Sequence, residues 1–416
     1  MISSTAAVAS LAMLALAAML VLPDGAGEPA PVPGAEGTTH LVAADGSGEH
    51  LTINEALAAA GEGDSILIAP GTYEEAIVIE TDITLAGTGT RPRETVIVVP
   101  ADAPEPLADV QPLHASIHGF EAPARPPVGV QLLDTDAALR NLQIEGRDEG
   151  VAVLVRGGAP VFEDVIIRHA GERDTNRVLA GSVFIDGASE PTFQGGQLWH
   201  RMQVDEASQV TMDETLLQWA KLVVQGGSHI DIEDGSSFGA DYQPITVVEE
   251  GTATIARTRF MEGGVDVLGS ADGAGSAQIS ESQFASAPGN AVRVEGGASA
   301  TLWDNDFTGN HRAVTVIGSA AEVRDSTFLD NRTSLEISGS GGEYRQNEIS
   351  GGVTGIELKD GGDAFIAGNT VDDARSRGIV IGAGTSPTVE GNRFCGSMVN
   401  VLLEEGAAPV FGENEV

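Results

Sequence analysis

The chain has 416 residues; aromatic residues make up only 4% of them, whereas glycine and proline number 53 and 19. This composition favours many short strands and turns and excludes a helical bundle. The 61 acidic and 22 basic residues give a net charge of −39, which disfavours nucleic acid and anionic membranes as partners. We therefore expect a partner that is neutral, cationic or bridged by metal ions, unless a local basic patch intervenes.

An apolar stretch opens the chain. Residues Ala6–Leu22 contain one serine and are followed by Pro23 and by the small residues Gly25–Gly27. This pattern predicts a signal peptide over residues 1–27, and hence a secreted or periplasmic protein. An uncleaved membrane anchor is the alternative, because about 17 apolar residues are at the short limit for a membrane span. Residues 28–37 read as a linker rich in proline, glycine and alanine.

Residues 38–137 are expected to form an N-terminal cap and the first coils of a repeat. Thr52–Ala60 starts with a Thr-x-x-Glu capping box and stops at Gly61, so it predicts a short amphipathic helix. A terminal repeat needs such a cap to cover its core. The strands expected next, and the proline-rich excursion after them, are Ser65–Ala69, Ala76–Ile79, Asp82–Ala86 and Pro100–Pro127.

An internal repeat fills residues 138–416. Its units are about 22 residues long, with a mean step of about 22.7, a period typical of solenoids. The unit starts are Ala138, Val161, Thr192, Thr211, Asp231, Thr254, Gln278, Thr301, Glu322, Glu343, Phe365, Thr388 and Val410.

Three positions recur within the units. One apolar residue stands one position after the unit start, and a second stands six positions after the same start. In the unit that starts at Thr254, these residues are Ile255 and Phe260. Stacked coils would collect these side chains into internal columns. Small polar residues recur at the fourth position and predict a hydrogen-bonded ladder in a sharp turn. The ladder residues are Thr258, Ser282, Asn305, Ser326, Asn347, Asn369, Asn392 and Asn414.

A strand precedes most unit starts, and its partners must come from neighbouring coils because the turns within a coil are short. Examples are Val151–Val155, Leu222–Val224 and Ile379–Ile381. The predicted fold is therefore all-β: a single-stranded right-handed parallel β-helix with a short N-terminal capping helix. The last coil places Phe411 near an exposed edge, so we expect Glu413 and Glu415 to guard this end, or self-association to cover it.

The stretch from Val42 to Gly87 resembles the start of pectin methylesterases and the wider pectin-lyase-like superfamily. The resemblance includes Val42–Gly48, the expected helix and the Gly-x-Tyr-x-Glu element of Gly71, Tyr73 and Glu75. Later coils, such as Ser386–Phe394, look like the β-helix repeats of carbohydrate-binding and sugar-hydrolase solenoids. The resemblance implies a right-handed β-helix and a carbohydrate partner.

The catalytic blocks of these families are missing. The sequence has no Gln-Asp-Thr, Asp-Phe-Ile-Phe-Gly or Gly-Arg-Pro-Trp element of the esterases, and no Asp-Pro-His-Asp of the alginate epimerases. No catalytic residue can therefore be carried over, and the fold alone does not define a chemistry.

Register nevertheless suggests a catalytic pair. Asp186 and Asp205 precede their unit starts by the same number of residues, so they should face outward on adjacent coils with carboxylates roughly 5 Å apart. Gln203 and Gln225 would flank them. Like charges so close raise one pKa, giving one acid and one nucleophile or base. The alternatives are a divalent-cation site, with calcium as the candidate ion, and a solvated acidic face.

A basic cluster lies nearby, in and after the longest step of the repeat. Longer loops on a solenoid usually line its binding face, and arginines with tryptophan platforms suit sugar carboxylates and pyranose rings. Pairing of the basic groups with neighbouring acids, and packing of the tryptophans against loops, is the structural alternative. The candidate substrate-binding residues are Arg168, His169, Arg173, Arg177, Trp199, His200, Arg201, Trp219 and Lys221.

Three classes of function follow from these features. The first is an exported β-helix that associates with polysaccharide and needs no cofactor. The second is a divergent carbohydrate esterase or lyase-like enzyme that uses Asp186 and Asp205. The third is a structural surface protein with a cation-binding acidic wall.

Overall fold

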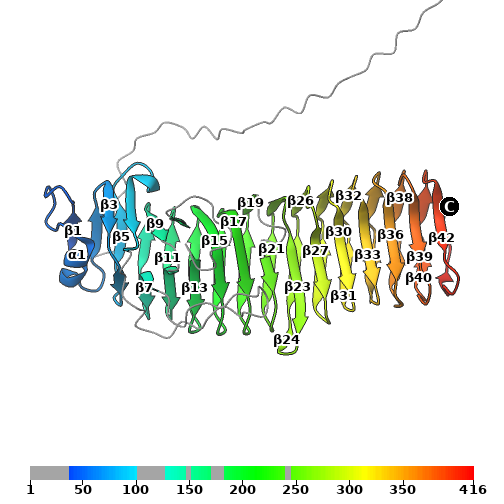
Figure 1. The fold of residues 1–416 in the computed structure, drawn as a ribbon, viewed down its shortest axis with the longest axis horizontal. Helices are drawn as coiled ribbons and strands as arrows, with labels where there is room; N and C mark the ends of the chain where they lie inside the picture. Colours follow the sequence, from blue (N-terminus) through cyan, green and yellow to red (C-terminus); the bar gives the residue numbers. More distant parts are fainter. Residues whose placement is uncertain (1–36, 101–126, 147–150, 170–181, 239–244) are drawn as a thin grey trace, which may run out of the picture. The chain divides into compact units, whose positions relative to one another are not determined.

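The computed structural model describes residues 37–100, 127–146, 151–169, 182–238 and 245–416. The signal peptide predicted over residues 1–27, nearly all of the linker and the excursion after Pro100 lie outside the described residues. Within them, the chain winds through successive coils of three short strands, and each strand pairs in parallel with its counterpart in the next coil (Figure 1). The predicted all-β parallel solenoid is confirmed.

The first strands of the coils form one 16-stranded sheet. In order, its members are β1 (Thr39–Val42), β2 (Ser65–Ile68), β5 (Thr84–Gly87), β8 (Ala138–Arg140), β11 (Val161–Glu163), β14 (Thr192–Gln194), β16 (Gln209–Asp213), β18 (His229–Glu233), β21 (Thr252–Ala256), β25 (Ser276–Ser280), β28 (Ser299–Trp303), β31 (Ala320–Arg324), β34 (Gly341–Arg345), β37 (Phe365–Ala367), β40 (Thr388–Glu390) and β43 (Val410–Phe411).

The second and third strands, together with one short antiparallel strand, form a 27-stranded sheet. Its second strands are β3 (Gly71–Glu74), β6 (Thr95–Val98), β9 (Gln143–Gly146), β12 (Ile166–His169), β19 (Ser236–Phe238), β22 (Arg259–Met261), β26 (Gln283–Ala285), β29 (Asp306–Thr308), β32 (Thr327–Leu329), β35 (Glu348–Ser350), β38 (Thr370–Asp372) and β41 (Arg393–Cys395). In two coils the second and third strands are continuous, as β15 (Gln197–Val204) and β17 (Leu216–Val224).

The third strands complete the coils. They are β4 (Ile77–Ile79), β7 (Val128–Leu133), β10 (Val151–Arg156), β13 (Ser182–Asp186), β20 (Ile245–Val247), β23 (Val265–Ser270), β27 (Asn290–Glu295), β30 (Arg312–Ile317), β33 (Thr333–Ser338), β36 (Thr354–Lys359), β39 (Arg377–Ile381) and β42 (Val399–Leu403). A two-residue strand, β24 (Gly273–Ala274), pairs antiparallel with β23, and a 3₁₀ turn, η1 (Pro92–Glu94), precedes β6.

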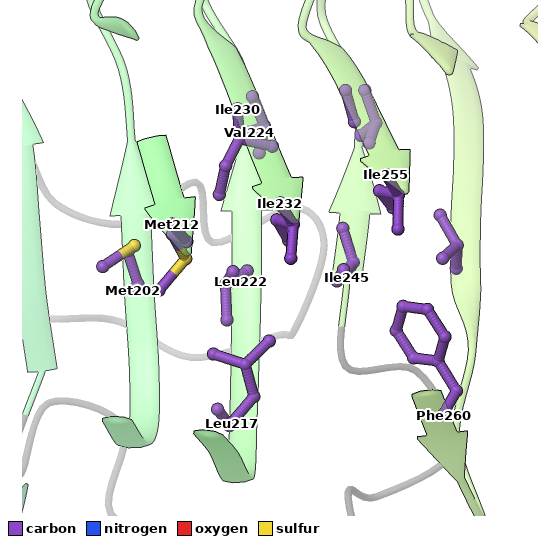
Figure 2. Close-up of a cluster of buried hydrophobic side chains, with 14 of the residues drawn as sticks. Met202, Met212, Leu217, Leu222, Val224, Ile230, Ile232, Ile245, Ile255 and Phe260 are labelled. Atoms are coloured by element: carbon purple, nitrogen blue, oxygen red, sulfur yellow. The ribbon is translucent and has the colours of Figure 1, made fainter. Parts of the chain in front are cut away.

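The predicted unit starts share one register. Ala138 pairs with Val161, and the pairing continues coil by coil to Thr388 and Val410. The apolar positions therefore stack inside the coils, where Ile255 and Phe260 are fully buried (Figure 2). Phe260, Phe284, Phe307 and Phe328 form a continuous stack with ring centroids 4.7 to 4.9 Å apart. One detail differs from the sequence analysis: the sixth position lies in a strand of its own.

The polar ladder is also confirmed. Asn369 Oδ1 accepts hydrogen bonds from the backbone N–H and the side-chain Nδ2 of Asn347, and the same pattern links Asn392 to Asn369. The predicted turn conformation is wrong by one residue, because the left-handed backbone belongs to the residue just before the ladder position. Gln346 has φ 54° and Gly368 has φ 64°. The side-chain amides of Asn347 and Asn369 instead donate to a first-strand carbonyl of the preceding coil and to the ladder residue of the next coil.

The N-terminal cap forms as expected. Helix α1 (Ile53–Ala59) begins after Thr52, whose side chain accepts the Glu55 N–H, and Ile53 and Ala56 are buried against the first coil. The Glu55 carboxylate accepts the N–H of Leu51 rather than that of Thr52, so the capping box is displaced by one residue. The strands after the cap differ from their predicted bounds by one or two residues, and β3 was not predicted.

Glu75 explains the last position of the Gly-x-Tyr-x-Glu element. Its carboxylate accepts the N–H groups of Ile53 and Asn54, at 2.8 and 2.9 Å, and the Asn54 amide at 2.8 Å. Because Glu75→Ala leaves these donors of the first helical turn without their partner, we expect the free energy of unfolding to fall by about 2 kcal/mol. Urea unfolding measures this change. Glu80→Ala, at an exposed position, is the control with an expected change below about 0.5 kcal/mol.

The last coil exposes apolar side chains, with Val410 at 62% and Phe411 at 45% of their full exposure. This agrees with the expected edge. Self-association there stays a prediction.

Candidate functional site

Insertions in the repeat share one place in the coil. The segments 101–126, 147–150, 170–181 and 239–244 each connect a second strand to a third strand. These four segments lie outside the described residues, so we use the name insertion corner only for the described connections from a second strand to a third strand. In the coils where these two strands are continuous, the insertion corner falls near Trp199 in β15 and near Trp219 in β17. Because the coils stack in register, the described insertion corners line up along the β-helix.

The two acidic residues of the predicted pair are neighbours, but they are not accessible to a substrate. The register of β13 with β15 continues past Ile185 and Val204, so Asp186 and Asp205 are neighbours. However, Asp186 is only 6% exposed, and its carboxylate forms a two-point ion pair with Arg156, the Nε–Oδ1 distance being 2.7 Å. The expectation of an exposed pair of like charges is therefore corrected: the charge nearest to Asp186 is a guanidinium from the preceding coil.

Asp205 is held by amide groups. It accepts hydrogen bonds from Gln225 Nε2 at 2.8 Å, from the Glu206 N–H at 2.8 Å and, more weakly, from Gln203 Nε2 at 3.4 Å. Gln203 and Gln225 are 4% and 2% exposed, and the cavity beside Asp186 and Asp205 has a volume of about 10 Å³. That is room for about one water molecule. The arrangement is a closed polar network with no space for a sugar ring.

The predicted basic cluster is only partly described. Arg168, on β12, contacts Glu145 of the preceding coil through Nε at 2.9 Å and Nη2 at 2.8 Å. Its charge is therefore already paired, as the structural alternative expected. Arg173 and Arg177, and the side chains of His169 and His200, lie outside the described residues.

Basic and aromatic residues occupy neighbouring positions of β15 and β17 at the insertion corner. Arg201 pairs in register with Lys221, and Trp219 forms a bulge with φ 57° that leaves its side chain 37% exposed. Trp199 is partly buried and donates from Nε1 to Gln197. Burial lowers the pKa of Arg201, and its buried Nη1 atom has no hydrogen-bond partner within the part of the chain that the structure describes.

A cleft that the sequence analysis missed continues the insertion corner through the later coils. Its volume is about 460 Å³, and all of its lining residues connect second strands to third strands. They are Ser286, Ala287, Pro288, Gly309, Asn310, His311, Asp330, Arg332, Gly352, Val353 and Arg375. A sugar ring fits such a volume, whereas the cavity beside Asp186 does not admit one.

Some polar side chains of the cleft have few or no partners among the described residues. Arg332 is exposed and makes no ion pair within the described chain, and Arg375 reaches Asp330 only at 3.9 Å. Burial, together with the charges of Arg312 and Arg332, lowers the pKa of His311, so that its ring is neutral at pH 7. His311 Nδ1 is buried and has no hydrogen-bond partner among the described residues. The single signal in the sequence was the recurrence of basic residues just before the third strands.

A second groove, with a volume of about 380 Å³, lies on the outside of the first-strand sheet. Short polar side chains such as Thr252, Gln278 and Thr301 line it, with His229 at its edge. His229 is engaged with Thr252 and Asp231 at 2.6 and 2.9 Å. This groove contains no arginine or lysine, which distinguishes it chemically from the cleft.

Asp266 is a buried acid that the sequence analysis also missed. It lies outward on β23 between Val265 and Val267 and is 4% exposed, and its Oδ1 atom has no hydrogen-bond partner in the described ranges. Burial raises the pKa of Asp266 to about 7, and Arg293, 4.0 Å away, opposes the rise. The folded protein therefore retains a proton that the unfolded chain releases near pH 4.

This difference predicts a pH effect. As pH rises from about 4 to 7, the unfolded chain loses the proton first, so the free energy of unfolding falls with pH. We expect Asp266→Asn to be nearly neutral at pH 4 and to stabilise the protein by about 2–4 kcal/mol at pH 8. Urea unfolding across this range measures the effect. Equal stability gains at both pH values would show that the Asp266 proton is not the cause.

Comparison with known proteins decides the handedness. Residues 263–416 match the family model described as the right handed beta helix region. The chain is a right-handed parallel β-helix protein. Its earlier coils continue the same two sheets without a break, so this fold extends through the described residues. No curated protein matches the sequence.

Several solved β-helix structures are similar to this one. The periplasmic alginate epimerase AlgG shares 8% identity, with 84% of this chain and 76% of that chain covered and a TM-score of 0.45. A GH87 alpha-1,3-glucanase from Streptomyces thermodiastaticus shares 11% identity, with 86% and 64% covered and a TM-score of 0.43. Pectin methylesterase PemA from Erwinia chrysanthemi shares 13% identity, with 62% and 80% covered and a TM-score of 0.36.

These values describe a likeness of fold, and no residue role is transferred from these proteins. Among the described residues of the β-helix, none of the helices has the length and apolar character needed to cross a membrane.

Proposed function

We propose that this β-helix binds polysaccharide along its insertion corner. The observation that carries the proposal is the cleft between Ser286 and Arg375 on a protein of net charge −39. Arg332, which makes no ion pair within the described chain, and Arg375, whose nearest acid is Asp330 at 3.9 Å, both line it. A solenoid repeats its surface every 4.8 Å or so along its axis, which suits a linear polymer more than a compact ligand.

The chemistry of the cleft favours sugars. Arg332 and Arg375 can donate hydrogen bonds to sugar hydroxyls or carboxylates, and the neutral His311 ring offers a further partner. The surface near Trp219 and Arg201 extends the same corner toward the earlier coils, with an aromatic side chain on which a pyranose ring can stack.

Mutation of the cleft tests this proposal. The full chain is screened on an array of neutral glucans and uronate polymers, with and without calcium, and the tightest glycan is taken forward. We expect the double variant Arg332→Ala/Arg375→Ala to weaken binding at least tenfold, about 1.4 kcal/mol, by calorimetry. Arg257→Ala is the control because this exposed arginine lies at a different corner, paired with Glu233 and Asp234. Equal affinities for all three proteins would contradict the proposal.

The enzyme alternative rests on Asp186 and Asp205. It requires that the closed network around these carboxylates open to admit a substrate. Product analysis on every glycan that binds separates the alternatives: loss of turnover in Asp186→Asn and Asp205→Asn would support an enzyme, and binding without turnover would support a lectin-like solenoid. Calcium that raises the melting temperature while leaving glycan affinity unchanged would favour the structural class.

A further inference from the structure

A cluster of metal-ligating side chains lies in the first coil, away from the cleft. His40 is on β1, and Glu49 and His50 end the segment that leads to α1. One donor atom from each residue lies within 4.8 Å of the others, and the two imidazole centroids are 5.5 Å apart. We propose that His40, Glu49 and His50 bind a divalent transition-metal ion, with zinc as the expected ion.

The backbone fixes these residues beside one another. The segment after β1 folds back, so that His50 N–H donates to Leu41 O at 3.0 Å and Ala43 N–H donates to His50 O at 3.0 Å. Val42 and His50 form a parallel bridge. The two histidines are therefore positioned by hydrogen-bonded backbone rather than by a free loop, and binding requires only side-chain adjustment.

The donor groups are available. Within the described residues, the Glu49 carboxylate and the His50 ring form no hydrogen bond or ion pair. His40 is 8% exposed and contacts Asp64 through Nε2, at 3.2 Å from Oδ2. Asp64 is itself held by the N–H groups of Gly61 and Thr38, at 2.7 and 2.6 Å. A carboxylate that orients a histidine ring in this way is the usual outer partner of a metal-bound histidine.

The ligand set selects the kind of metal. Two imidazole nitrogens with one carboxylate oxygen suit zinc, whereas calcium prefers oxygen ligands alone. Three protein ligands leave one position of a tetrahedral site for water. The ion would join β1 to the segment that precedes α1, and so would fasten the N-terminal cap to the first coil.

Zinc titration tests the site. The full chain, free of any histidine tag and stripped of metal with a chelator, is titrated with zinc chloride by calorimetry, and its melting temperature is measured with and without zinc. We expect one zinc ion per chain at this site and a higher melting temperature. His50→Gln should lower the affinity at least tenfold and Glu49→Gln less, while both keep the metal-free melting temperature of the parent.

Two controls make the result specific. His229→Gln removes a histidine that is hydrogen-bonded elsewhere, and His114→Gln/His118→Gln removes the pair in the proline-rich excursion. Both variants should bind zinc as the parent does. Absence of zinc binding, unchanged affinity in His50→Gln, or loss of binding in either control would each overturn the proposal. His40 is left intact in the test because its burial makes a variant prone to misfolding.

Discussion

Phe307→Ala is expected to destabilise the β-helix by about 3–5 kcal/mol. Phe307 is fully buried and stacks between Phe284 and Phe328, with ring centroids 4.9 and 4.8 Å away. Its removal leaves a cavity in a column that the coils above and below cannot fill, because parallel pairing on every strand fixes the spacing of the coils. Urea unfolding followed by circular dichroism measures the loss.

Phe411→Ala is the matched control. This phenylalanine occupies a unit position one after the start, as Phe162 does, but is 45% exposed in the last coil. We expect it to cost less than about 1 kcal/mol. A long repeat array can unfold in stages, so the comparison also includes the number of transitions. Similar losses in the two variants would mean that the phenylalanine column does not hold the coils together.

Asn369→Ala is expected to cost about 2–4 kcal/mol. The side-chain oxygen Oδ1 of Asn369 accepts hydrogen bonds from the backbone N–H and the Nδ2 group of Asn347, at 3.0 and 2.9 Å. The Nδ2 group of Asn369 donates to Tyr344 O at 2.8 Å. All of these groups are buried, and alanine would leave them without partners. Chemical denaturation at neutral pH measures the difference from the parent.

Asn369→Ser provides the graded control. Serine occupies the same ladder position at Ser326, where its hydroxyl accepts the N–H of Asn305 at 3.2 Å. We therefore expect the serine variant to keep part of the ladder and to lose only about half as much stability as the alanine variant. A serine variant no better than alanine would show that the hydrogen bonds are not the source of the effect.

The fold could be predicted from the sequence because the same pattern of apolar and polar positions recurs in each coil. The column that contains Phe307 and the ladder that contains Asn369 are periodic, and a period fixes register without knowledge of distant contacts. The second strand of each coil was harder to recognise in the sequence. β22 and most of its counterparts are three residues long, too short to show alternation, so only their central apolar residue was recognised.

The candidate site was less accessible to sequence analysis. Register correctly placed Asp186 beside Asp205, but it did not show that Arg156, from the preceding coil, neutralises Asp186. The cleft was not recognised in the sequence because its lining residues come from several coils and are not contiguous along the chain. Burial of Asp266 was equally invisible, since an acid between two valines on a strand looks like an ordinary solvent-facing residue.

Hydrogen–deuterium exchange of the β-helix, with and without the tightest-binding glycan from the array, tests the central claim most directly. Binding along the insertion corner predicts slower exchange in the turns that contain Pro288, His311 and Arg332, with no change on the first-strand sheet. Protection centred instead on Thr252, Gln278 and Thr301, in the groove of that other sheet, would contradict the account, as would a bound glycan that protects neither surface.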